Sequence, residues 1–136
     1  MLTIQSFCFN AFQENTFVLF NSEKEAIIVD PGCYLKHEQA QLANFISVNN
    51  LTPKLLLNTH CHLDHVFGNN FVSETYGLTA LFHQKEQAVI DRLPEGGARW
   101  GVPTEAYKGK VQYIQQDELI QFGKDVFKVL ETPGHS

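Results

Sequence analysis

Three histidines and one aspartate lie close together in the stretch Thr59–His65. They are His60, His62, Asp64 and His65. A neutral imidazole is a good ligand for zinc and similar divalent ions, and a carboxylate suits harder ions or a second metal. Without a metal, such a cluster would bring together several polar groups that each need a partner, which is costly. The stretch therefore predicts a metal site.

The segments on either side of this stretch would place it where ligands commonly bind. The apolar run Leu55–Leu57 predicts a short buried strand before it, and the pattern of residues 66–76 predicts a helix after it. In α/β proteins, ligands usually bind in loops at the carboxyl ends of strands, next to the start of a helix. We therefore expect the histidine-rich stretch to be such a loop.

The spacing of the residues also predicts which side chains point together. Side chains alternate in an extended loop, so His60, His62 and Asp64 should share one side. His65 should turn back toward the same cavity from the first turn of the helix. Cys61 should point the other way and pack inward, although a role as an extra ligand or a reactive thiol is the alternative.

The rest of the chain predicts alternating strands and helices. The first three strands should be antiparallel, the first helix should make a parallel crossover, and the last three strands should form a second antiparallel set. We expect strands at 2–9, 17–20, 26–30, 53–57, 78–82, 111–114, 118–122 and 125–130, and helices at 36–49, 66–76 and 84–92.

Two features interrupt this pattern. Gly68 lowers the helix propensity of its segment, so it should permit a close approach between backbones. Residues 93–109 contain many glycines and prolines and predict a loop. We interpret this loop either as a lid, with Trp100 or Tyr107 as possible substrate-lining residues, or as an insertion that packs on the surface.

Composition excludes several classes of protein. A chain of 136 residues with 43% hydrophobic and 18% charged residues suits one soluble globular domain. The net charge of −5 and the scattered basic residues give no support for nucleic-acid binding, and no apolar run approaches a membrane span. The odd count of three cysteines suits a reducing compartment, and the N-terminus does not resemble a signal peptide, so we expect a cytoplasmic protein without a membrane partner.

The histidine-rich stretch, with Thr59 in front, resembles the metal-binding signature of the metallo-β-lactamase fold hydrolases. Three further segments are similar to landmarks of this family, in the same order along the chain: residues 15–19 to its second strand, 30–32 (Asp-Pro-Gly) to its strand-ending turn, and 132–136 to its next metal motif. Residues 13–16 and the short length are similar to small glyoxalase II-like hydrolases.

This resemblance implies an α/β (α+β) fold, the αβ/βα sandwich of the family. The chain would contain the first half of the sandwich and the start of the second, as a single domain over residues 1–136 that is incomplete at its C-terminus. One face of the sheet would then be uncovered, which favours a homo-oligomer.

The resemblance also implies a set of metal ligands. His60, His62 and His135 would give three nitrogen ligands and leave a fourth position for water, as at a catalytic zinc. Asp64, with a metal-binding or proton-accepting catalytic role, would begin a second site together with His65. The resemblance favours a supporting role for Asp30, which would orient the histidine loop, rather than direct ligation.

The expected function is hydrolysis of a thioester or activated ester, such as a glutathione thioester, by metal-bound hydroxide. One or two Zn²⁺ ions would serve, with iron or manganese as alternatives. Two other interpretations stay open: a mononuclear iron sulfur dioxygenase-like enzyme, and a non-catalytic metal-binding or interaction fragment. A nuclease lacks a supporting basic patch, and β-lactam hydrolysis lacks a supporting export signal.

Overall fold

A computed structural model describes residues 1–136 of the chain. Its strands are β1 (Thr3–Phe9), β2 (Glu14–Phe20), β3 (Glu25–Val29), β4 (Thr52–Leu57), β5 (Ala80–Phe82), β6 (Val111–Tyr113), β7 (Leu119–Phe122) and β8 (Asp125–Lys128). Its helices are α1 (Lys36–Val48), α2 (Leu63–Val66), α3 (Asn69–Tyr76), α4 (Gln87–Ile90) and α5 (Leu93–Trp100), with a 3₁₀ turn, η1 (Gln84–Glu86), before α4.

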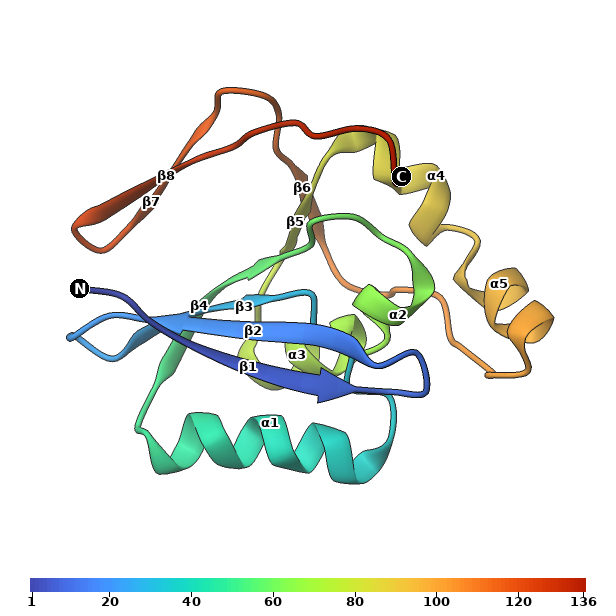
Figure 1. Cartoon of the computed structure of the whole chain (residues 1–136), viewed down its shortest axis with the longest axis horizontal. Helices are drawn as coiled ribbons and strands as arrows, with labels where there is room; N and C mark the ends of the chain where they lie inside the picture. The colour runs from blue at the N-terminus through green and yellow to red at the C-terminus, as the bar shows by residue number, and fades with distance from the viewer.

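One six-stranded mixed sheet organises the fold, with the strand order β1-β2-β3-β4-β5-β6 (Figure 1). Strands β1 to β3 are antiparallel, whereas β3 to β6 are parallel neighbours. Helix α1 links β3 to β4, which confirms the predicted parallel crossover. The loop that leaves the carboxyl end of β4 carries the histidine-rich stretch.

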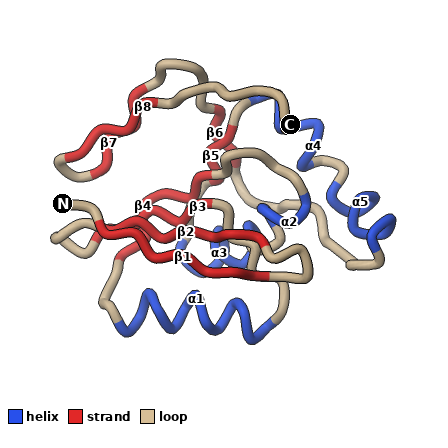
Figure 2. Tube along the Cα trace, viewed as in Figure 1, coloured by secondary structure: helices blue, strands red, loops and turns tan.

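Helix α1 lies along one face of this sheet (Figure 2). The main hydrophobic core joins residues of the sheet to residues of the helices. Leu42 and Ile46 of α1 and Val72 of α3 pack with Ile28 and Leu56 of the central strands. These side chains recur at helical spacing on α1, so the helix has one apolar face to bury. The core fixes β3 and β4 side by side, and with them the loops at their carboxyl ends.

A second, smaller apolar cluster lies on the other face of the sheet. It joins Leu81 of β5 and Ile114, which follows β6, to Ile120 of β7. Strands β7 and β8 form a separate antiparallel hairpin that reaches over this face (Figure 1). The hairpin therefore places the C-terminal segment across the sheet from α1.

The structure corrects two predictions about strands and loops. Strand β6 pairs in parallel with β5 and completes the first sheet, so only β7 and β8 form the predicted second antiparallel set. Residues 93–100 of the predicted loop form helix α5, with Leu93 and Gly97 buried and Gly101 in a left-handed conformation at its end. The glycines of this segment predicted a loop, but the segment is a short amphipathic helix with a proline in its first turn.

The predicted helix at 66–76 is divided and begins earlier. Helix α2 starts at Leu63, inside the histidine-rich stretch, and α3 starts at Asn69 after a break at Gly68. The N–H of Gly68 donates to the carbonyl oxygen of Pro31 at 2.7 Å, which confirms the predicted close approach of backbones. No helix of the structure has the length and apolar character of a membrane span.

Replacing Gly68 by alanine should lower the free energy of unfolding by about 1–3 kcal/mol, which is typical of overpacking. A Cβ atom there would overlap the Cys33 sulfur and lie 2.8 Å from the carbonyl oxygen of Pro31, and both belong to a buried turn. Urea unfolding measures the change. The matched control is Gly96→Ala in α5, where a Cβ meets nothing within 4 Å and should add about 0.5–1 kcal/mol through helix propensity. Equal effects of the two substitutions would contradict this explanation.

Candidate metal centre

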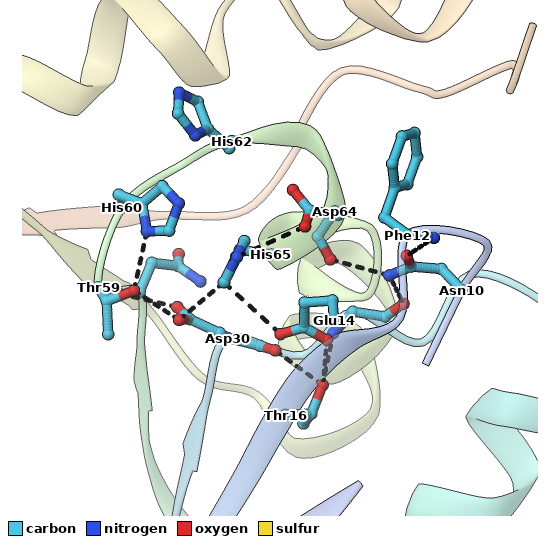
Figure 3. Close-up of polar contacts among 12 residues, drawn as sticks. Asn10, Phe12, Glu14, Thr16, Asp30, Thr59, His60, His62, Asp64 and His65 are labelled. Carbon is cyan, nitrogen blue, oxygen red and sulfur yellow. Dashed lines mark hydrogen bonds and ion pairs between the residues drawn. The ribbon is translucent and has the colours of Figure 1, made fainter. Parts of the chain in front are cut away.

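The five side chains predicted as metal ligands come from two distant parts of the chain. His60 lies in the loop after β4, His62 is the N-cap residue of α2, and Asp64 and His65 belong to that short helix. His135 lies in the terminal segment that follows β8. Figure 3 shows the first four around Asp30 and Glu14.

His60, His62 and His135 form a compact group, which we call the histidine triad. One ring nitrogen of each residue lies within 4.8 Å of those of the other two. Nδ1 of His62 is 3.2 Å from Nε2 of His135, although 73 positions separate the two residues in the chain. The structure thus brings together the two motifs that the sequence places far apart.

A chain of hydrogen bonds fixes the ring of His60. The Thr59 hydroxyl donates to Oδ2 of Asp30 at 2.5 Å, so it can accept a hydrogen bond from Nδ1 of His60 at 3.0 Å (Figure 3). A proton on Nδ1 leaves the lone pair on Nε2, and this atom is buried without a hydrogen-bond partner. Burial, and then the nearby His65, lower the pKa of His60, which keeps the imidazole neutral. The ring that carries this unpartnered nitrogen lies 4.7 Å from the ring of His62 and 4.8 Å from that of His135, centroid to centroid, and such an arrangement fits a cation.

Asp30 supports this arrangement from the end of β3. Its backbone has a positive φ of 50°, an uncommon conformation for a residue other than glycine, and this turn directs the carboxylate toward the loop. Oδ1 accepts the Thr59 N–H at 2.7 Å, and Oδ2 lies 3.0 Å from Nδ1 of His65. Because donors already engage both oxygens, these contacts favour the supporting role over ligation.

His65 lies among three carboxyl groups. Nδ1 is 3.0 Å from Asp30 and 3.6 Å from Glu14, whereas Nε2 is 3.5 Å from Oδ2 of Asp64. Burial alone would lower the pKa of His65, but the hydrogen bond that its Nδ1–H donates to Asp30 and the negative charges of Asp30 and Asp64 raise it. A proton or a metal ion between Nε2 and Asp64 would relieve the repulsion between the lone pair and the carboxylate.

The local conformation differs from the predicted alternation at Asp64. His62 is extended, but Asp64 lies within α2, so Asp64 meets His65 rather than the side shared by His60 and His62 (Figure 3). Cys61 is fully buried in the main core, which confirms the predicted inward packing. Burial raises the pKa of its thiol, which argues against a reactive thiolate.

The two aromatic residues considered as substrate-lining have different surroundings. Trp100 is 66% exposed at the end of α5 and packs edge-on against Phe12, with the ring centroids 5.6 Å apart. Tyr107 lines a cavity of about 270 Å³ beside α2 and α3 that contains none of the histidine triad, and its hydroxyl donates to the carbonyl oxygen of Lys110. Neither residue contacts the histidine triad.

Two buried glutamates were not predicted to belong to the site. Glu14 lies beneath His65, and burial raises its pKa to about 8. The available signal was its position in β2, where it shares the inward register with Thr16 and Val18. Glu86 in η1 accepts a hydrogen bond from the N–H of Cys61 at 2.7 Å, and no sequence pattern marks it.

Comparison with known proteins shows the family to which the chain belongs. The sequence profile of the Metallo-beta-lactamase superfamily matches residues 9–136. The hydroxyacylglutathione hydrolase GloC of Haemophilus influenzae is 32% identical over 128 residues, which is 93% of this chain and 58% of that protein.

Two crystal structures have the same fold. The BLEG-1 B3 metallo-beta-lactamase superposes with a TM-score of 0.86 at 30% identity, over 98% of this chain and 63% of that one. TTHA1623 in a di-iron-bound form superposes with a TM-score of 0.81 at 25% identity, over 97% and 62% of the two chains. The chain thus spans about three fifths of the length of these relatives. On the match over residues 9–136, it belongs to the Metallo-beta-lactamase superfamily.

Proposed function

We propose that this chain carries the metal-binding part of a metal-dependent hydrolase that cleaves a thioester or a similarly activated ester. The observation that carries the proposal is the histidine triad, in which one ring nitrogen of each residue lies within 4.8 Å of the others, together with the buried, unpartnered Nε2 of His60. Three imidazoles with no fourth protein ligand are typical of a catalytic rather than a structural zinc site.

Each side chain has a distinct part in the proposed reaction. His60, His62 and His135 would hold the first cation, while Asp64 and His65 would hold a second cation or accept a proton. Asp30 and Thr59 keep His60 and His65 in the orientations described above. A divalent cation bound there would lower the pKa of a coordinated water and polarise the substrate carbonyl.

The identity of the cation is part of the proposal. Zinc is proposed as the working metal because a triad of neutral imidazoles suits it well. The di-iron form of TTHA1623 supports iron as the alternative. Metal analysis of the purified chain distinguishes the two, and iron as the sole metal would favour the dioxygenase interpretation.

The substrate class is inferred from the relatives. GloC is named as a hydroxyacylglutathione hydrolase, which supports a glutathione thioester. The structure of BLEG-1 is described as a B3 metallo-beta-lactamase, which makes a β-lactam the appropriate comparison substrate.

Removing the metal from the protein that carries this chain should abolish its activity. The zinc-loaded protein should hydrolyse a hydroxyacylglutathione, with release of the thiol followed by absorbance, and should act at least 100-fold more slowly on a β-lactam. EDTA should reduce the rate by about three orders of magnitude or more, since the metal supplies the nucleophile, and added Zn²⁺ should restore it. A fully zinc-loaded protein that leaves the thioester intact would refute the proposed reaction.

A further inference from the structure

We propose that Glu86 is a positioning residue that ties together the two segments carrying the histidine triad. The inference rests on the proposed metal site, but its geometry is independent of the substrate. One oxygen of Glu86 accepts the N–H of Cys61 at 2.7 Å, and the hydroxyl of Ser136 lies 2.8 Å from both oxygens. Cys61 lies between His60 and His62 in the chain, and Ser136 directly follows His135.

Few other contacts hold the terminal segment in place. From Thr132 onward, its only hydrogen bonds are those of His135 with His62 and of Ser136 with Glu86. The residues of this segment are exposed, so little apolar burial offsets the entropy of ordering them. Among the contacts made within residues 1–136, the one with Glu86 is therefore the main restraint that aims His135 before any metal binds.

Glu86 is well placed to act as a fixed anchor. Its side chain belongs to η1, directly after β5, and the residue is only 8% exposed. It forms no ion pair, and the partners of its carboxylate are the Cys61 N–H and the Ser136 hydroxyl. Hydrogen bonds to an ionised acceptor are stronger than neutral ones, and truncating such an acceptor releases both donors together.

The test combines two measurements on the 136-residue chain. The first is the {¹H}–¹⁵N heteronuclear NOE of the His135 and Ser136 amides without metal, which should fall in Glu86→Ala because the segment becomes mobile. The second is titration with Co²⁺, followed by visible absorption. The affinity of Glu86→Ala for Co²⁺ should be about 10- to 100-fold lower than that of the wild type, as is usual when a group that orients a ligand is removed.

Three further variants separate positioning from general destabilisation. Glu86→Gln keeps an oxygen for the Cys61 N–H and an amide that can donate to the Ser136 hydroxyl, so it should restore most of the affinity. Ser136→Ala leaves the anchor intact and frees only the terminal segment, so it should weaken Co²⁺ binding while urea unfolding stays unchanged. Glu105→Ala removes an exposed glutamate that pairs only with Lys108, and it serves as the control.

The outcomes distinguish this inference from the proposed function. If the wild-type chain binds no Co²⁺, the proposed metal site fails, while the NOE still tests the role of Glu86. If the wild-type chain binds Co²⁺ and both Glu86→Ala and Ser136→Ala keep its affinity and the order of the terminal segment, the inference is overturned. Should Glu86→Ala fail to fold, Ser136→Ala alone decides in the same way.

Discussion

Replacing His135 by alanine should reduce the affinity of the chain for one Zn²⁺ or Co²⁺ ion by more than about 100-fold, which exceeds the usual effect of losing only a group that orients a ligand. Nε2 of His135 lies 3.2 Å from the ring of His62, and with His60 the two form the histidine triad. Two remaining imidazoles would hold a cation weakly. In the Co²⁺ form, the intense visible absorption of a four-coordinate site should disappear.

The substitution should leave the metal-free fold unchanged. His135 is exposed in the terminal segment, so its removal leaves no cavity, and the urea midpoint should stay that of the wild type. His37→Ala is the matched control, because His37 is also exposed but lies at the start of α1. If His135→Ala binds Co²⁺ as tightly as His37→Ala, then His135 is not a ligand and the proposed reaction loses its basis.

The sequence predicted the location of the site better than its geometry. The spacing of the histidines after an apolar run placed His60 and His62 in a loop after a strand and His65 in the first turn of the next helix, and that placement is confirmed. The conformation of Asp64 was mispredicted because α2 begins at Leu63, inside the motif, where an extended loop was expected. A single turn of helix is too short to leave a periodic pattern.

The misassigned parts of the fold have local physical causes. Gly96 and Gly97 lower helix propensity, yet α5 forms because Gly97 allows the backbone to pack closely against Val102 and Thr104. Strand β6 has only three residues, and its pairing with β5 depends on tertiary packing. Sequence periodicity does not report either effect.

The supporting residues of the site also show that local sequence patterns do not reveal tertiary contacts. Asp30 was expected near the histidine loop through its place in the strand-ending turn, and it contacts Thr59 and His65. Glu86 lies 25 positions from Cys61, and the two are neighbours only because β5 follows β4 in the sheet. A residue that acts through a tertiary hydrogen bond leaves no mark in local spacing.

In the metal-free chain, Glu14 should make the free energy of unfolding fall as pH rises, and Glu14→Gln should abolish this fall. Burial raises the pKa of Glu14 from 4.5 to about 8, although the hydrogen bond from Thr16 and the charge of His65 act in the opposite direction. Between these two values the native state holds a proton that the unfolded state has released. The free energy of unfolding therefore falls as pH rises, by up to about 1.4 kcal/mol per pH unit from this group, and the loss ends near the native pKa.

Urea unfolding at about pH 5 and pH 6, in the window between the two pKa values, measures this slope. The charge of Glu14 also contributes to the raised pKa of His65, but this interval lies below the usual histidine pKa of about 6.5, so the difference between wild type and Glu14→Gln mainly reports the carboxyl group. That difference should change by about 1 kcal/mol across the interval. Glu74 is exposed on α3, so the free energy of unfolding of the control Glu74→Gln should change with pH as that of the wild type does. If the free energy of unfolding of Glu14→Gln also changes with pH as that of the wild type does, Glu14 is ionised in the native state. The His65 imidazolium, rather than a proton on the carboxyl group, would then neutralise the unpartnered oxygen of Glu14.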